Sequence, residues 1–187
     1  MILPNISDFI KSHVTKREKS FFNNDLIKNK EKLSNEIKNK SILVIGGAGT
    51  IGSSFIKAAL RYLPTELIVV DTNENGLTEL TRTLRSDSNI LVPDKYITYP
   101  MSFNSNVFYK MLKKHGTFDI IANFAAHKHV RSEKDSFSIE AMIKNNVLDA
   151  KRFLDFLRLN KPSHFFCVSP NFLIKDNVYL HNSSILY

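Results

Sequence analysis

Four of the six glycines in this chain of 187 residues lie within one heptapeptide, residues 46–52, which reads Gly-Gly-Ala-Gly-Thr-Ile-Gly. The heptapeptide follows a continuous apolar run, Ile42 to Ile45, of the kind that forms a strand buried on both faces. A helical pattern comes next, with apolar residues between Phe55 and Leu60 on one face. Glycine is scarce elsewhere in the chain, so its concentration between a strand and a helix indicates a backbone requirement at this turn.

The spacing of Gly46, Gly49 and Gly52 is that of a dinucleotide-binding turn. In such a turn the first glycine permits the tight bend, the second lets the backbone approach a pyrophosphate, and the third lets the helix pack closely on the sheet. The start of the helix, at Thr50 and Ile51, would present free N–H groups and the positive end of the helix dipole to phosphate oxygens. The alternative is a glycine-rich turn with a purely structural role.

A carboxylate stands where such a site needs one. Asp71 ends a second buried strand, residues 67–71, and lies nineteen residues after Gly52. At that spacing it can accept hydrogen bonds from the adenosine ribose hydroxyls. Its charge would repel a 2′-phosphate, so we expect NAD rather than NADP. Arg82 or Arg85 could fold back to offset that charge, which leaves NADP open.

Strands and helices alternate along the rest of the chain. We expect strands at 42–45, 67–71, 96–99, 118–124 and 164–169, and helices after 52, around 77–84, at 107–114 and at 139–159. This alternation predicts an α/β fold, a Rossmann-type doubly wound parallel sheet with helices on both faces. We expect a helical leader at residues 1–40 with an amphipathic helix over 25–38, an NAD(P)-binding domain at 41–169, and an atypical tail at 170–187.

Composition narrows the class further. With 43% hydrophobic and 24% charged residues the chain is typical of a globular protein, and no apolar run approaches the roughly 20 residues of a membrane span. The single cysteine, Cys167, precludes an intrachain disulfide and suits a cytoplasmic location. About half of the net charge of +8 lies in residues 1–41, where lysines alternate with Asn and Glu as on a solvated surface. We therefore do not expect nucleic-acid binding.

Several motifs together resemble the extended short-chain dehydrogenase/reductases: residues 42–52, Asp71, residues 123–130, and Asn145-Asn146-Val147. Residues 125–130, Ala-Ala-His-Lys-His-Val, are similar to the corresponding motif of UDP-N-acetylglucosamine 4,6-dehydratases of bacterial polysaccharide, flagellin-glycan and nonulosonic acid biosynthesis. The resemblance covers roughly residues 20–169. It implies an enzyme that oxidises the sugar at C4 with its nicotinamide cofactor, eliminates water across C5–C6 and returns the hydride to C6.

The resemblance also implies roles for individual residues. Ala125 and Ala126 would lie beside the nicotinamide, although tight packing alone also explains two alanines. Lys128 and His129 would lie near the substrate diphosphate or sugar, but a surface lysine is an equally ordinary interpretation. Asn146 would support the active site through a backbone or water contact, or be an ordinary helix residue. We expect no metal, because His127 and His129 at i and i+2 have no further ligands nearby.

Two departures from the family pattern stand out. Ser102 occupies the position after the third strand where the family usually has an aspartate that reaches the adenine, and its hydroxyl could donate a weaker hydrogen bond. Ser169 is the last matching active-site position. The family continues with Thr-Asp-Lys and then a Tyr-x-x-x-Lys pair, whereas this chain continues with Pro170 and has Ser183 four residues after Tyr179. No catalytic acid or base is therefore assigned, and only Ser169 and Asn146 are scaffold candidates.

These observations predict the cofactor-binding part of a nucleotide-sugar 4,6-dehydratase, shortened after Ser169 by truncation or a change of reading frame and inactive alone. The alternatives are a non-catalytic dinucleotide-binding module and a fragment of a related epimerase or reductase. The expected ligands are a dinucleotide and a UDP-sugar. The spacing of Ile143, Val147, Ala150, Leu154 and Leu157 predicts one buried face for the helix over 139–159. This apolar stripe could pair two copies in a homo-oligomer, or it simply covers the sheet.

Overall fold

The computed structural model describes residues 9–16, 22–127 and 135–168, and the chain divides into two compact units, residues 1–36 and 37–187. The first unit contains a π-helical segment, η1 (Ile10–Thr15), then α2 (Asn23–Lys28) and most of α3 (Lys30–Ile37). The single helix predicted over 25–38 is thus divided at Asn29. The Asn29 side chain donates to the carbonyl of Asp25 at 2.8 Å, a local bond that competes with a continuous helix.

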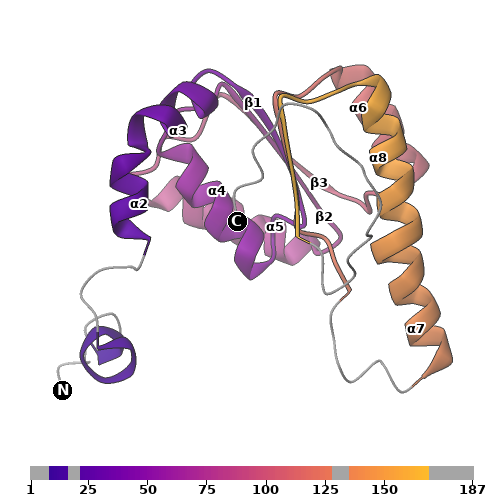
Figure 1. Ribbon diagram of the computed structural model, residues 1–187, viewed down its shortest axis with the longest axis horizontal. Coiled ribbons are helices and arrows are strands. Elements are labelled where there is room, and N and C mark those ends of the chain that lie inside the picture. The colour runs from indigo at the N-terminus through magenta and orange to yellow at the C-terminus, as the bar shows by residue number, and fades with distance from the viewer. Residues whose placement is uncertain (1–8, 17–21, 128–134, 169–187) are drawn as a thin grey trace. The chain divides into compact units, whose positions relative to one another are not determined.

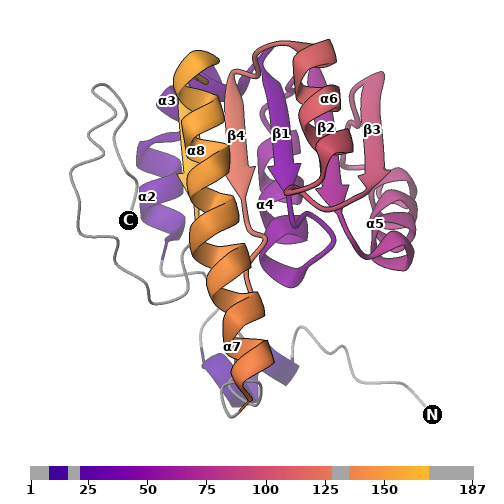
Figure 2. The same ribbon diagram turned by 90° about the vertical axis from the view of Figure 1, so that its right-hand side faces the viewer.

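The second unit is built on five parallel strands (Figure 2). The strands are β1 (Ser41–Ile45), β2 (Glu66–Asp71), β3 (Lys95–Pro100), β4 (Ile120–Asn123) and β5 (His164–Cys167). Their order, β3-β2-β1-β4-β5, confirms the predicted doubly wound sheet. The order reverses between β1 and β4, and α/β folds commonly bind their ligands at the carboxyl ends of the strands beside such a reversal.

Helices cover both faces of this sheet, as expected (Figure 1). They are α4 (Thr50–Leu60), α5 (Glu74–Ser86), α6 (Asn106–His115) and α8 (Ala150–Leu159). Helix α7 (Ser136–Ile143) and the π-helical turn η3 (Lys144–Asp149) precede α8, and α7 extends beyond the ends of the strands (Figure 2). Successive residues of a strand point to opposite faces, so Ile42 and Val44 pack with α4 and α5, whereas Leu43 and Ile45 pack with α6 and α8. The continuous apolar runs in β1 and β2 reflect this burial on both sides.

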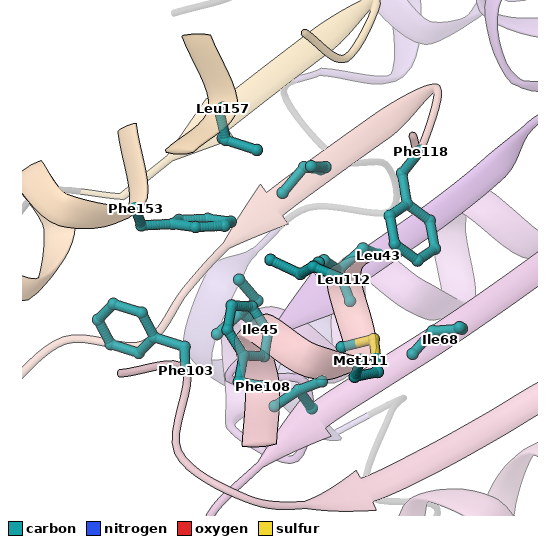
Figure 3. Packing of buried hydrophobic residues seen from close by; sticks show 12 residues of the cluster. Leu43, Ile45, Ile68, Phe103, Phe108, Met111, Leu112, Phe118, Phe153 and Leu157 are labelled. Carbon is teal, nitrogen blue, oxygen red and sulfur yellow. The ribbon is translucent and has the colours of Figure 1, made fainter. Parts of the chain in front are cut away.

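Aromatic residues fill the face beneath α6 and α8 (Figure 3). Phe153 of α8 is fully buried, and its ring centroid lies 5.6 Å from that of Phe108 and 6.3 Å from that of Phe103. Both pairs meet edge to face, the arrangement that aromatic quadrupoles favour. This packing holds α8 on that face of the sheet.

The long helix of α7, η3 and α8 differs from its prediction in two respects. It begins at Ser136, because Asp135 caps it by accepting the N–H of Ser138 at 3.0 Å, and the π-helical turn interrupts it. Ile143, assigned by its spacing to the buried face, is 41% exposed, and Phe153 carries the burial instead. A π-helical turn holds an extra residue, so the side chains on either side of it no longer follow one α-helical stripe.

Within the described ranges, none of the helices combines the length and the apolar composition that crossing a membrane requires.

Candidate functional site

The glycine loop, residues 46–49, joins β1 to α4 at the point where the strand order reverses. Gly46 has φ +74°, and a Cβ there would lie 2.7 Å from the backbone nitrogen of Ala125. A Cβ on Gly52 would lie 2.3 Å from the carbonyl oxygen of Gly46. Both clashes involve backbone atoms, so the folded chain itself requires glycine at these two positions.

Gly49 is different, because nothing in the part of the chain that the structure describes requires a glycine there. Its φ of −73° and ψ of 165° suit any residue, and the nearest atom to an added Cβ is the Gly46 oxygen at 3.4 Å. Gly49 is the N-cap of α4 and supplies no side-chain acceptor. The first free N–H groups of the helix, at Thr50, Ile51 and Gly52, therefore have no cap. The loop is an open cradle of N–H donors that a side chain would fill, as a bound phosphate requires.

Asp71 lies at the carboxyl end of β2 and is tied to the glycine loop. Its Oδ2 accepts the N–H of Ala48 at 2.9 Å, and its Oδ1 accepts the N–H of Asn73 at 2.9 Å. A carboxylate has about four acceptor positions, so these two bonds fix its orientation and leave capacity for ribose hydroxyls. Sequence reasoning found Asp71 but not its bond to Ala48, since contacts between residues 23 positions apart leave no local pattern.

The first turn of α5 also rests on the glycine loop. Asn73 caps this helix by accepting the N–H of Gly76 at 3.0 Å. A Cβ on Gly76 would lie 2.9 Å from the Cβ of Ala48, so this glycine permits the close approach. Arg82, which could have offset Asp71, donates instead to Glu79 at 2.6 Å on the exposed side of α5.

The alanine loop, residues 124–127, follows β4 and lies directly against Gly46. Buried Asn123 turns the chain here, because its Oδ1 accepts the N–H of Ala125 at 3.0 Å. Ala125 and Ala126 are partly buried beside the glycine loop. This arrangement brings together two groups of residues that the sequence assigned to one cofactor site.

Asn146 of the π-helical turn holds the alanine loop from the other side. Its Oδ1 accepts the N–H of His127 at 2.9 Å, and its Nδ2 donates to the carbonyl of His127 at 2.8 Å. The two bonds form a reciprocal pair that fixes the backbone of the loop. This is a backbone contact of the kind that the resemblance implies for Asn146.

The remaining predicted residues are less informative. Ser102 is partly buried at the end of β3, and its carbonyl accepts the Ser105 hydroxyl at 2.7 Å. Lys128, His129 and Ser169 lie outside the described residues, as do Tyr179 and Ser183. Among the residues that the structure describes, no three His, Cys, Asp or Glu side chains gather as metal ligands.

A Tyr-x-x-x-Lys spacing that sequence reasoning passed over occurs at Tyr109 and Lys113 of α6. The Tyr109 ring packs edge to face against Phe156, and the Arg152 guanidinium lies 4.6 Å from its centroid. Burial raises the pKa of Tyr109, which is the opposite of what a catalytic tyrosinate needs. The structure thus places Tyr109 in the packing between α6 and α8, whereas Lys113 is exposed.

The parallel sheet, its strand order and the glycine loop at the switch point define a Rossmann fold. The sequence model of one family, described as polysaccharide biosynthesis protein, matches residues 42–175, more than half of the chain. The chain belongs to that family, and the recognition made from its motifs is confirmed.

A curated relative agrees with this family, and solved structures share the fold. The chain is 25% identical over 141 residues to the probable polysaccharide biosynthesis protein EpsC of Bacillus subtilis, covering 73% of this chain and 22% of EpsC. The epimerase Mth375 of Methanothermobacter thermautotrophicus superposes with a TM-score of 0.58 at 17% identity, over 87% of this chain and 44% of that one. Bordetella bronchiseptica WbmF in complex with NAD+ gives 0.54 at 18% identity, over 79% and 42%. The chain spans 16–22% of the length of the curated relatives that it matches.

Proposed function

We propose that residues 41–169 bind NAD and form the cofactor-binding part of a nucleotide-sugar-modifying enzyme of polysaccharide biosynthesis. Residues 1–40 would be a helical leader and residues 170–187 a separate tail. Family membership supports the pathway class. The crystal structure of WbmF with NAD+ supports the choice of ligand, because that protein shares the fold.

The observation that carries the proposal is Gly49. The fold tolerates a side chain at this position, yet the position has none and faces the uncapped N–H groups of Thr50 and Ile51. Any residue with a capping side chain would serve the helix better. An approaching pyrophosphate explains the glycine, since a side chain would occupy the space of its oxygens.

The other residues suit the rest of the same ligand. Asp71 would accept the adenosine ribose hydroxyls, and its charge favours NAD over NADP. Ser102 would reach toward the adenine from the end of β3. Ala125 and Ala126, against the glycine loop, would leave room for the nicotinamide. When bound, NAD supplies a hydride acceptor for the sugar.

For the particular reaction we propose the 4,6-dehydration of UDP-N-acetylglucosamine. The support is the motif at residues 125–130, which resembles that of the UDP-N-acetylglucosamine 4,6-dehydratases. Lys128 and His129 would meet the diphosphate or the sugar, and Asn146 would hold their loop. Since no acid or base is assigned, we expect the polypeptide of 187 residues to bind NAD without dehydratase turnover. A related epimerase reaction and a non-catalytic binding module are the alternatives.

Calorimetric titration of the purified chain with NAD, NADP and UDP-N-acetylglucosamine separately tests the proposal. We expect binding of NAD and weaker binding of NADP. The decisive variant is Gly49→Ser, whose hydroxyl would cap α4 and fill the cradle, with Ser54→Ala in the next turn as matched control. Failure of the wild-type chain to bind either dinucleotide would overturn the proposed function. Conversion of UDP-N-acetylglucosamine to a 4-keto-6-deoxy sugar would overturn the expected inactivity.

The exposed apolar residues of the long helix motivate one further proposal, self-association. Phe137 is 78% exposed and Leu148 59% exposed. Sedimentation of the wild-type chain and of Leu148→Glu tests it, with a purely monomeric wild-type chain as the contradicting result.

A further inference from the structure

A buried carboxylate outside the predicted site joins the π-helical turn to the loop after β3. Asp149 ends the π-helical turn and is 7% exposed. Its Oδ2 accepts the Asn104 Nδ2 at 2.7 Å, and both its oxygens accept the Lys144 Nζ, at 2.9 and 3.2 Å. Asn104 belongs to the loop after β3, two residues beyond Ser102. We name Asn104, Lys144 and Asp149 the carboxylate cluster.

The spacing within this cluster depends on the π-helical turn. Lys144 and Asp149 are five residues apart. In an α-helix of 3.6 residues per turn, residues five apart lie roughly 140° from alignment, so their side chains would diverge. In a π-helix the backbone hydrogen bond joins residues i and i+5, which places them one above the other. The ion pair is therefore available to the π-helical turn and not to a regular helix.

The same turn determines where Asn146 points. Asn146 lies between Lys144 and Asp149, and its amide bonds both the N–H and the carbonyl of His127. A π-helical turn holds one more residue than an α-helical turn. If it relaxed to an α-helix, that extra residue would shift into the neighbouring turn. The side chains before that point would then rotate by about 100° relative to those after it. Asn146 would lose its alignment with the alanine loop.

We propose that Asp149 is a positioning residue for the cofactor site. Its carboxylate, held by Asn104 and Lys144, keeps the π-helical turn in the register that aims Asn146 at the His127 backbone. It thereby links the loop after β3 to the alanine loop after β4, on opposite sides of the strand-order reversal. The consequence for NAD affinity rests on the proposed function, whereas the consequence for the loop does not.

Hydrogen exchange at the His127 amide, measured by NMR without ligand, is the direct test. We expect exchange about tenfold faster in Asp149→Ala, because the bond that protects this amide is lost, and a smaller increase in Asp149→Asn. The Ser53 amide of α4, which donates to Gly49 at 2.9 Å, serves as an internal reference. Asp155→Asn is the matched control, since Asp155 lies on the same helix and pairs only with Lys151 and Arg158 among the described residues.

Faster exchange at His127 with an unchanged Ser53 supports the positioning role. Equal rises at both amides would show general loosening and overturn it, as would an unchanged His127 rate in Asp149→Asn. If Asp149→Ala does not fold, the Asp149→Asn variant decides. A wild-type chain that fails to bind NAD while His127 responds to Asp149 would refute the proposed function and leave the positioning inference intact.

Discussion

The glycine loop and the alanine loop face each other across the strand-order reversal, but the chain holds them in different ways. The glycine loop is fixed by its own backbone: the Gly46 N–H donates to Val70 at 2.8 Å, and the tight contact of Gly52 with Gly46 leaves no space for a side chain. The alanine loop is fixed by the side chain of Asn146, nineteen residues away. The backbone contacts of Gly46 and Gly52 form a clamp that tolerates no side chain at either position. The Asn146 side chain is a brace that can be removed without unfolding the sheet.

The largest effect is expected from Gly52→Ala, which attacks the backbone clamp. The added Cβ would meet two backbone segments, those of Gly46 and Gly47, and neither can move without disturbing β1. We expect a loss of about 3 kcal/mol in the free energy of unfolding, measured by urea denaturation. Gly49→Ser, three residues earlier, should unfold like the wild-type chain. Equal stability of the two variants would show that the backbone around Gly52 can accommodate a side chain, and would contradict the clamp.

Asp71→Asn should have the next largest effect. An asparagine offers one acceptor where the carboxylate now binds the N–H groups of both Ala48 and Asn73. We expect a loss of about 2 kcal/mol in stability and about tenfold in NAD affinity. NADP should lose less, because the repulsion of its 2′-phosphate disappears. Asp87→Asn, at the far end of α5, is the control, and an unchanged ratio of NAD to NADP affinity would contradict the role of Asp71.

Asn146→Ala removes the brace of the alanine loop. Two hydrogen bonds to an exposed backbone segment are lost. We therefore expect a loss of about 1 kcal/mol in the free energy of unfolding and a roughly three- to tenfold loss of NAD affinity. Lys151→Ala on the solvent side of α8 controls for changes in helix propensity. A loss of stability as large as that of Gly52→Ala would remove the distinction between clamp and brace.

The smallest effect is expected at the amino ends of the strands, the end of the sheet opposite the glycine loop. The backbone N–H of Ser41 donates to Asp119 at 2.9 Å and is the main reason that the pKa of this carboxyl lies below its usual value; the Ser41 hydroxyl and Lys40 add to it. Because Asp119 is partly exposed, Asp119→Asn should cost only about 0.5–1 kcal/mol at neutral pH.

The pH dependence of that difference follows from the direction of the shift. A lowered pKa stabilises the fold above the unfolded-state value, near 3.9, and the contribution is lost as pH falls through the folded-state value. The gap in stability between wild type and Asp119→Asn should therefore narrow below about pH 4. NAD affinity should stay unchanged, because Asp119 lies at the amino ends of the strands. A gap that widens in acid would contradict this assignment.

The sheet and the glycine loop were predictable because their signals are local. The apolar run from Ile42 to Ile45, the glycine spacing and Asp71 each lie within a few residues of the structure that they determine. The predicted fourth strand, 118–124, is shorter in the structure. Before its start, the carboxylate of Asp119 accepts the N–H of Ser41 in β1. At its end, the Oδ1 of Asn123 accepts the N–H of Ala125 and turns the chain.

The π-helical turn that carries Asn146 could not be predicted from local signals of this kind. The bond from Asn104 to Asp149, which we propose to hold the π-helical turn in place, spans 45 residues. A periodicity of 3.6 residues assigned Ile143 to the buried face and missed the turn, since an inserted residue leaves no composition signal. Tertiary contacts of single polar side chains are thus where the sequence pattern stops being informative.

The most direct test of the account is the NAD affinity of Gly49→Ser compared with its stability. The account predicts opposite responses: stability unchanged or raised by a few tenths of a kcal/mol, because serine caps α4, and NAD affinity reduced at least about tenfold, because the same hydroxyl fills the phosphate cradle. Wild-type NAD affinity in a fully folded Gly49→Ser protein would contradict the central claim that the glycine loop is a dinucleotide site.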